Sequence, residues 1–499
     1  MGRGWEMMEF AKIPSVRYRE RDSMAKVAKN QPKKALSTTG PFRAWFGSAR
    51  HPRYIEALLN KKGAEVFVVG GAVRDALLGR TAKRDLDLVV RGIPLPALIR
   101  ILKPFGRVDE VGRVFGVIKF VPRGQRGQNA IDIALPRTEF SFGTGGYKDV
   151  ETKSRHTLPL AEDLARRDFT VNAMAWDLAA SRLIDPYAGE QDLSKKVLRA
   201  VGDPTKRFQE DYTRILRLLR FSVELDFSIH PATWSAGKHL IARVSDQRTG
   251  QWVVPRELVA KELLKSFLAN PLETFLLWDR IGAWRVLIPE LVAMKRVPQP
   301  EQYHTEGDVW QHTQLALTVL MGKAFAKQFP DGWDAQTALG VLFHDIGKPP
   351  TLKTPEKHGT DRIRFDGHDA AGARMTRSVA DRLALASYKS AGIDVSPERL
   401  EWMVAHHLLM VNANANDLRP QTIERYFFSA QNPGDTLRKV MFCDTAATIN
   451  ANGKPFWKSF RALEKRIAAV AKTRSVSGEM PKPLLTGDGI MKAFGLAPG

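Results

Sequence analysis

The order of apolar and polar residues divides the first third of the chain into short strands and helices. An apolar run over 66–69 predicts a buried strand that breaks at Gly70-Gly71. The first elements are expected as a strand over 66–69, a helix over 72–78, a strand over 86–90, a hairpin over 109–122 and a strand over 130–135. This alternation of strands and helices predicts an α/β domain.

Helical patterns replace the strands in the rest of the chain. Residues 207–221 place their apolar side chains on one face of a helix, and residues 255–267 open a second amphipathic helix. Between residues 300 and 450, apolar residues flank histidines and aspartates in contexts typical of helices. The pattern therefore predicts an α/β head followed by an all-α neck and a further all-α domain.

The chain has 499 residues, enough for three or more domains, of which 43% are hydrophobic and 26% charged. These proportions are typical of a globular protein, and no apolar run approaches the roughly 20 residues that a membrane span needs. Cys443 is the single cysteine, which excludes an internal disulfide and suits a reducing cytoplasm. We therefore expect a multidomain, cytoplasmic protein without a membrane segment.

The net charge of +22 and the isoelectric point near 10.0 narrow the class of partner. A polyanion is the simplest partner for such a charge, and nucleic acid is the obvious one. An anionic membrane surface is the alternative, but no basic amphipathic helix with an aromatic face stands out. Residues 1–53 are basic and lack a pattern, so they are expected to form a flexible arm, and the tail over 473–499 is expected to be loosely structured.

Asp85 and Asp87 stand two residues apart at the start of the second expected strand, so their side chains point the same way. Two carboxylates this close repel each other unless cations lie between them. Two Mg²⁺ ions about 3.5–4 Å apart, bridged by such carboxylates, are what nucleotidyl transfer needs. The Gly70-Gly71 turn offers backbone N–H groups to a triphosphate, although either feature alone is common.

Asp132 lies between two isoleucines in the strand expected over 130–135. An acidic side chain in an apolar strand is costly unless it is paired or close to a metal ion. Asp132 is therefore either a third metal-binding carboxylate or the salt-bridge partner of Arg137. The following segment, 143–156, is rich in glycine and in charges of both signs and is expected to be a mobile loop.

Two further charged groups have both a chemical and a structural interpretation. Arg166, Arg167 and Asp168 precede an expected helix, where guanidinium groups could grip a triphosphate, but such a triplet is more often a solvated surface. Asp211 and Arg214 lie three residues apart in the helix over 207–221, so they are neighbours on one side of it. On spacing alone, this pair is an ordinary salt bridge.

Most of the eleven histidines fall after residue 300. They recur with aspartates as an ordered series: His312, His344-Asp345, His368, His406-His407 and Asp444. Imidazole and carboxylate ligands together suit Mn²⁺, Fe²⁺, Ni²⁺, Co²⁺ or Zn²⁺. A lone histidine is normally structural, but five such elements in order predict a metal site. His304 precedes the series and is expected in a loop or behind the ligands.

Taken together, the motifs of the first half resemble those of the bacterial class II tRNA nucleotidyltransferases, the CCA-adding enzymes, and of their poly(A) polymerase relatives. The resemblance implies a head with the fold of the DNA polymerase β superfamily, with Asp85, Asp87 and Asp132 as catalytic carboxylates and Mg²⁺ as cofactor. Residues 166–173 reproduce the family's RRDFTxNA motif, whose arginine and aspartate hold ribose and phosphates. The nucleotide is expected to contact Gly70, Gly71, Arg74, Arg166, Arg167, Asp168 and Asn172.

The resemblance also assigns a role to the helix over 207–221. Residues 210–214 match the family's EDxxR motif, in which the aspartate and the arginine read the incoming base. Cytosine and adenine both present an amine beside an accepting ring nitrogen, so Asp211 and Arg214 could admit CTP and ATP and reject UTP and GTP. Arg217 and Arg220 are expected to contact phosphates or RNA. Residues 185–193 look like the family's hinge between head and neck.

The histidine series resembles the HD superfamily of metal-dependent phosphohydrolases. This implies His312, His344, Asp345, His368, Asp444 and either His406 or His407 as ligands of a divalent transition metal such as Ni²⁺, Mn²⁺, Co²⁺ or Zn²⁺. HD domains fused to tRNA nucleotidyltransferases carry phosphatase and 2′,3′-cyclic phosphodiesterase activity, which implies trimming of RNA ends. The expected organisation is an arm over 1–53, the head over 54–200, the neck over 201–298, the HD domain over 299–472 and the tail over 473–499.

The resemblance predicts tRNA, ATP and CTP as partners and leaves two alternatives and the oligomeric state open. A poly(A) polymerase usually carries a GRRF-type segment, whereas this chain has Gly112-Arg113-Val114-Phe115, which favours CCA addition. The other alternative is an HD phosphohydrolase whose head has decayed into an RNA-binding module. The intact Asp85 and Asp87 and the intact motif over 166–173 argue against it.

Overall fold

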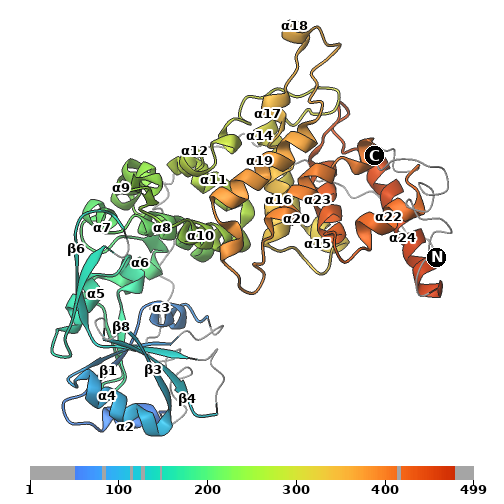
Figure 1. The fold of residues 1–499 in the computed structure, drawn as a ribbon. Coiled ribbons are helices and arrows are strands. Elements are labelled where there is room, and N and C mark those ends of the chain that lie inside the picture. Colours follow the sequence, from blue (N-terminus) through green and yellow to red (C-terminus); the bar gives the residue numbers. More distant parts are fainter. Residues whose placement is uncertain are drawn as a thin grey trace. The chain divides into compact units, whose positions relative to one another are not determined.

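The computed structural model describes residues 51–80, 86–112, 116–124, 130–146, 149–412 and 417–477. These residues pack as two units (Figure 1). The first unit contains the described residues up to 139 together with 152–202 and 227–230, and the second contains 140–151, 203–226 and the described residues from 231 onward. The chain therefore passes from head to neck near the expected boundary, whereas the expected neck and HD domain belong to one unit.

A seven-stranded mixed sheet forms the first unit, in the order β3-β4-β5-β2-β1-β8-β9. Strand β1 (Glu65–Val69) is antiparallel to both β2 (Asp87–Arg91) and β8 (Ala175–Asp177), while β2 is parallel to β5 (Ile131–Ala134). Consecutive residues of β1 and β2 are buried, as expected for central strands covered on both faces. The remaining strands of the sheet are β3 (Gly106–Gly112), β4 (Val117–Pro122) and β9 (Arg182–Ile184).

Short helices cover this sheet. Phe67, Val69 and Val89 of the central strands pack with Leu160 and Leu164 of helix α5 in one buried cluster. The helices of the unit are α2 (Arg53–Leu59), α3 (Gly71–Leu77), α4 (Leu95–Leu102), α5 (Leu160–Ala165) and α6 (Gly189–Ser194), with 3₁₀ turns η1 (Lys103–Phe105) and η4 (Thr170–Asn172). The short strands β10 (Val197–Leu198) and β11 (Ser228–Ile229) pair in parallel.

Two predictions for the head are wrong. The expected loop over 143–156 contains a strand, β7 (Val150–Ser154), which pairs with β6 (Arg137–Ser141). This polar hairpin lies outside the main sheet, so it lacks the apolar alternation that marks a strand. The expected hinge over 185–193 lies inside the first unit, where the Asp185 carboxylate accepts from the N–H groups of Gly189 and Glu190 at the start of α6.

The second unit is almost entirely helical. Its first helices are α7 (Pro204–Glu210), α8 (Thr213–Leu225), α9 (Pro231–Leu240), α10 (Arg256–Ala269), α11 (Pro271–Ile281), α12 (Ala283–Leu287) and α13 (Pro289–Val292). The remaining helices are α14 (Val309–Leu320), α15 (Lys323–Gln328), α16 (Ala335–Phe343), α17 (Lys348–Thr351), α18 (Pro355–His358), α19 (His368–Arg382), α20 (Pro397–His406), α21 (Leu409–Asn412), α22 (Pro420–Phe427), α23 (Gly434–Ala447) and α24 (Trp457–Ser477). Minor elements are η5 (Ile241–Ser245), η6 (Leu385–Ser387) and the ribbon of β12 (Gln247–Arg248) with β13 (Gln251–Trp252).

Aromatic packing explains why the expected neck and HD domain form one unit. Trp278 and Trp284 are fully buried and stack with ring centroids 5.1 Å apart. Phe275 of α11 stacks on Trp310 of α14 at 4.0 Å, so the core continues across the boundary expected at 298. No helix among the described residues is long and apolar enough to cross a membrane.

Two helix predictions for this unit also need correction. The helix expected over 207–221 is interrupted, because Asp211 has an extended backbone (φ −159°, ψ 105°) between α7 and α8. The tail expected to be loose from residue 473 begins inside α24, which continues to Ser477. The rest of that tail, most of the expected arm, Asp85 and the Arg113–Phe115 segment lie outside the described residues.

Candidate active site of the head and candidate metal centre

The glycine turn after β1 is shaped for a close neighbour. Gly70 has a φ of +74°, and a Cβ at this position would lie 2.6 Å from Nη1 of Arg167. Any side chain here would therefore both strain the backbone and displace the guanidinium. Helix α3 starts at the next residue and carries Arg74, which is buried and donates from Nη1 to Oδ1 of Asn172 at 2.8 Å.

The RRDFTVNA segment meets this turn through a chain of hydrogen bonds. Oδ1 of Asp168 accepts from the Phe169 N–H at 2.8 Å and from Nδ2 of Asn172 at 3.1 Å. Because Asn172 also accepts from Arg74, the two motifs are connected by side chains that are all buried. The structure thus brings together five expected nucleotide ligands: Gly70, Arg74, Arg167, Asp168 and Asn172.

Asp163 anchors the two arginines, and the sequence did not single it out. Its carboxylate is fully buried and lies 3.1 Å from Nε of Arg166 and 3.4 Å from Nη2 of Arg167. Arg166 also pairs with Glu139 at 2.7 Å. Burial lowers the pKa of Arg167, against the opposing charges of Asp163 and Asp87. The solvated-surface interpretation of this motif is wrong, since each guanidinium side chain is only 18% exposed.

The two described carboxylates of the head face each other across neighbouring strands. Asp87 opens β2 and is the direct register partner of Asp132 on the parallel strand β5. Arg137 pairs with Glu139 at 3.3 Å, and the described residues show no ion pair between Arg137 and Asp132. The salt-bridge interpretation of Asp132 is therefore wrong. The charge of Asp87 opposes the lowering of the pKa of Arg167, so this carboxylate lies within electrostatic reach of the guanidinium.

The EDxxR motif lies at the break between α7 and α8. Oδ1 of Asp211 accepts from the Thr213 N–H at 2.8 Å and from its hydroxyl at 2.5 Å. Arg214 donates to Oε2 of Glu210 at 2.6 Å, while its Nε lies 3.9 Å from Oδ2 of Asp211. Burial raises the pKa of Asp211, and the bonds to Thr213 and the charge of Arg214 oppose that rise. Asp211 and Arg214 are thus adjacent, but each is bonded more closely to another group.

Arg220 is paired with acidic side chains of its own unit. Its Nε lies 2.5 Å from Oε2 of Glu262 on α10, and its Nη1 lies 2.5 Å from Glu224. The guanidinium also stacks 3.8 Å over the ring of Phe221, and the side chain is 7% exposed. These contacts favour a structural role for Arg220 over the predicted contact with phosphates or RNA. Arg217 is half-buried, with its guanidinium 5.3 Å from the ring of Phe221.

The histidine series converges in the second unit, from five separate helices or helix ends. His312 lies on α14, His344-Asp345 follows α16, His368 opens α19, His407 follows α20 and Asp444 lies on α23. Nε2 of His312 lies 3.2 Å from both Nε2 of His344 and Oδ1 of Asp444. All of these residues except Asp444 are at most 8% exposed.

Asp345 divides the cluster into two sets of imidazoles. Its Oδ2 lies 3.3 Å from His344 and 3.7 Å from His312, whereas its Oδ1 lies 3.5 Å from His368 and 3.9 Å from His407. Each set, taken with Asp345, places its ligand atoms close enough to hold a metal ion. Nζ of Lys348 also contacts Oδ2 at 2.7 Å and donates to Oε1 of Gln299, so it neutralises part of the charge.

Backbone carbonyl oxygens fix the orientation of three of these rings. Nδ1 of His344, His368 and His407 lies 2.8, 2.8 and 2.6 Å from the carbonyl oxygens of the residues three positions before each. An Nδ1–H donated in this way leaves Nε2 with a free lone pair, as metal ligands require. Nε2 of His368 and of His407 is buried without a hydrogen-bond partner. Burial, followed by the neighbouring imidazoles, lowers the pKa of His407 to about 4.

The structure distinguishes His407 from His406. His407 is 1% exposed and faces Asp345, whereas His406 packs between the rings of Trp402 and Tyr426 at 4.6 and 5.0 Å. Nδ1 of His406 lies 2.7 Å from the Trp402 carbonyl oxygen. Of the two histidines that the sequence left open, the structure favours His407 as the ligand, because consecutive residues of a helix point about 100° apart.

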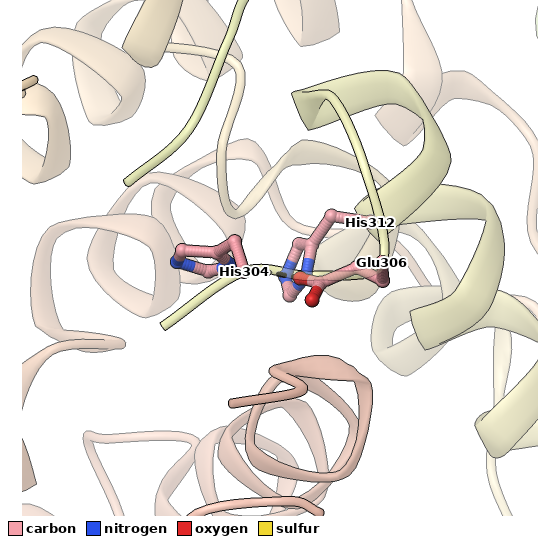
Figure 2. A group of neighbouring side chains, drawn as sticks. All are labelled: His304, Glu306 and His312. Carbon is pink, nitrogen blue, oxygen red and sulfur yellow. Dashed lines mark hydrogen bonds and ion pairs between the residues drawn. The ribbon is translucent and has the colours of Figure 1, made fainter. Parts of the chain in front are cut away.

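Glu306 is the member of this site that the sequence did not reveal. Figure 2 shows its carboxylate between two imidazoles, with Oε1 2.7 Å from Nδ1 of His304 and 2.8 Å from Nδ1 of His312. Oε2 accepts from the Ile449 N–H at 3.0 Å. Burial alone would raise the pKa of Glu306, but the bonds from His304 and His312 lower it to about 2. His304 lies in a loop behind His312, as expected.

Comparisons with known proteins agree with this description. A family model described as the poly A polymerase head domain matches residues 66–199, and a model described as the HD domain matches residues 317–433. The multifunctional CCA protein of Nitrosococcus oceani is 32% identical over 361 residues, which cover 72% of this chain and 78% of that protein. His312 and Asp444 fall just outside the HD match, so the structure is what joins them to the cluster.

Solved structures share the fold. A CCA-adding enzyme in complex with ATP superposes with a TM-score of 0.55 at 19% identity, covering 89% of each chain. A Thermotoga maritima CCA-adding enzyme complexed with tRNA gives a TM-score of 0.50 at 20% identity, covering 90% of this chain and 88% of that one. The mixed sheet followed by helices is thus the architecture of these enzymes.

Proposed function

This chain belongs to the family of the multifunctional CCA proteins, and we propose that it adds C, C and A to the 3′ end of tRNA from CTP and ATP. The observation that supports the proposal most is the junction of the glycine turn with the RRDFTVNA segment, whose Arg167 lies within electrostatic reach of Asp87, the register partner of Asp132. We also propose that the protein acts in the cytoplasm, in keeping with its single cysteine.

The head would work by positioning and charge. Arg167, held by Asp163, would grip the triphosphate beside the Gly70 turn, while Asp168 and Asn172 would hold the ribose. Asp87 and Asp132, with Asp85, would hold Mg²⁺, because hard oxygen ligands in adjacent strands fit that ion. When bound there, Mg²⁺ neutralises charge on the transferred phosphate and favours the deprotonated 3′-hydroxyl.

The head proposal is tested by Asp87→Ala. Loss of this carboxylate should abolish incorporation of labelled CTP and ATP into tRNA that lacks its 3′ end, because the metal ions would be lost or misplaced. The same preparation should retain phosphohydrolase activity, which shows that it is folded. Near wild-type incorporation by this variant would overturn the two-metal assignment.

We propose that Asp211 and Arg214 choose the base. The carboxylate would accept from the exocyclic amine of cytosine or adenine, and the guanidinium would donate to the ring nitrogen. Asp211→Ala and Arg214→Ala should therefore raise incorporation of UTP and GTP relative to CTP and ATP, since each loses about 1–3 kcal/mol of discrimination. A uniform fall for all four nucleotides would assign the pair a structural role only.

The histidine cluster is proposed to be a phosphatase and 2′,3′-cyclic phosphodiesterase that uses Ni²⁺, Mn²⁺, Co²⁺ or Zn²⁺. The cluster offers buried imidazole and carboxylate donors, Nε2 of His368 and of His407 lacks a hydrogen-bond partner, and the lowered pKa of His407 keeps that ring neutral, so the set fits this class of ion. Such an ion supplies an activated water at neutral pH. The residues of the chain would hold it: His312, His344, Asp345 and Asp444 on one side and His368 and His407 on the other.

Asp345→Ala tests the hydrolase proposal because this carboxylate contacts both sets of imidazoles. The variant should lose bound metal and the hydrolysis of phosphomonoesters and 2′,3′-cyclic phosphates. Nucleotide addition by the head should continue, since its carboxylates lie in the other unit. Equal metal content and equal hydrolysis in the two proteins would mean that the cluster is structural.

A further inference from the structure

Two segments meet beside the metal cluster and carry an exposed aromatic pair. The first contains Tyr303, His304 and Thr305, and the second runs from Ile449 to Phe456. Thr305 donates to the Ile449 carbonyl oxygen from its N–H at 2.8 Å and its hydroxyl at 3.1 Å, and Ile449 bridges back to Pro455. Tyr303 and Phe456 consequently meet with ring centroids 5.9 Å apart and planes at 58°.

Both rings of this aromatic pair are exposed to solvent. Tyr303 is 40% exposed and Phe456 45% exposed, and they are two of only seven large hydrophobic residues exposed among those the structure describes. Neither contributes to the core, and exposing such rings to water has a cost that a ligand would remove. Their position is tied to the cluster, because Glu306, bonded to His312, also accepts from the Ile449 N–H.

A basic surface begins directly after Phe456. Helix α24 buries Phe460, Leu463 and Ile467 and exposes Lys458, Arg461 and Lys465. The three exposed residues are spaced i, i+3 and i+7, so they lie on one helix face over about 10 Å. We call them the α24 basic face. None of them has an ion pair among the described residues, and the nearby Glu464 pairs with Arg438.

We propose that the aromatic pair stacks the terminal base of a single-stranded RNA 3′ end, and that the α24 basic face follows its phosphates. Base stacking on aromatic rings beside a basic track is how single strands are held without sequence preference. The net charge of +22 and the lack of acidic side chains within this face favour a polyanion over a protein partner. The proposal rests on the hydrolase function and names its substrate as an RNA end.

The first test removes charge from the helix. Arg461→Gln/Lys465→Gln is compared with Lys323→Gln/Arg399→Gln, which removes the same charge from two other exposed residues. Lys323 opens α15, eleven residues after His312, and Arg399 lies in the first turn of α20, eight residues before His407. Substrates are a ten-nucleotide RNA ending in a 2′,3′-cyclic phosphate and 2′,3′-cyclic AMP. The ratio of kcat/KM for RNA to that for the mononucleotide should fall about tenfold at low salt in the first variant only. In this variant, the slope of log kcat/KM for the RNA against log salt concentration should be less steep than in the wild type by about 1.4, at roughly 0.7 per charge removed.

The second test addresses stacking. Tyr303→Leu/Phe456→Leu should lower kcat/KM about tenfold or more for both nucleotide substrates, relative to ribose 2,3-cyclic phosphate, which has no base. Independently of hydrolysis, a 5-iodouridine at the 3′ terminus of the RNA should photo-crosslink to Tyr303 or Phe456 in the wild-type protein. Equal kcat/KM ratios in all variants, or crosslinks confined to other peptides, would overturn the proposal. If the wild type hydrolyses none of these substrates, the hydrolase function fails, and the crosslink alone still decides the docking.

Discussion

Replacing Glu306 by glutamine should weaken metal binding at the histidine cluster and leave the proposed Mg²⁺ site of the head unchanged. The substitution keeps the shape of the side chain and removes its charge. Oε1 accepts from two imidazoles at 2.7 and 2.8 Å, and Oε2 accepts from the Ile449 N–H at 3.0 Å. A glutamine has one amide oxygen and one amide NH₂ group in place of the two carboxylate oxygens. In either orientation, the NH₂ group would face a donor, either the two imidazoles or the Ile449 N–H.

The size of the effect follows from these contacts. A hydrogen bond to a charged group contributes about 1.5–3 kcal/mol, and loss of the group behind a metal-bound histidine costs about 10–100-fold in affinity. That range equals about 1.4–2.7 kcal/mol of binding free energy. The folded protein loses stability as well, because a carboxyl with a lowered pKa stabilises it above about pH 4.5, an effect lost as the pH falls through about 2.

Competition titration of the metal-free protein with Ni²⁺ or Co²⁺ against a chelator measures this change. Glu301→Gln is the matched control, because Glu301 is an exposed glutamate on the same connection. We expect the Glu306→Gln variant to bind 10–100-fold more weakly and the control to match wild type. An affinity within about twofold of wild type for Glu306→Gln would refute the role assigned to this carboxylate.

Three further outcomes can be checked on the same protein. His407→Ala should lose most of its bound metal by elemental analysis, whereas His406→Ala should keep it, because only His407 faces Asp345. Arg220→Ala should lower the free energy of unfolding by about 3–5 kcal/mol in denaturant titrations, because it leaves the buried carboxylate of Glu262 without its partner. The same variant should leave nucleotide choice unchanged. Burial would lower the pKa of His312, but bonds to Asp444 and Glu306 raise it to about 9 in the metal-free protein. A metal ion must displace that proton, so apparent affinity should rise with pH up to about 9, and flat affinity from pH 6.5 to 9 would contradict this.

Local motifs of the head could be predicted from the sequence because chain neighbours carry them. The apolar run before Gly70 predicts a strand and a turn, and the two-residue spacing of Asp85 and Asp87 predicts carboxylates on one side of the next strand. Both predictions need only neighbouring residues. Asp163 was missed although its signal is local: it precedes Arg166 and Arg167 by three and four residues, the spacing at which helical side chains meet. The hairpin of β6 and β7 was missed because its strands lack an apolar face.

The histidine cluster shows both a missed signal and a real limit. Leu400, Met403 and Val404 are buried on one face of α20, and His407 continues that face at i+7, so periodicity alone favours it over His406. Glu306 carried no such signal, since it lies in a loop that folds back against His312. The pairing of Arg220 with Glu262 joins residues 42 positions apart, and only the packing of α8 on α10 reveals it.

Incubation of tRNA lacking its 3′ CCA with each labelled nucleotide, singly and in pairs, tests the central claim most directly. The account predicts incorporation from CTP alone, then a single terminal A when ATP is added, and a stop after three nucleotides. UTP and GTP should give little product. A long ladder from ATP alone would instead identify a poly(A) polymerase, and no incorporation by a protein that still hydrolyses 2′,3′-cyclic phosphates would show that the head is not a nucleotidyltransferase.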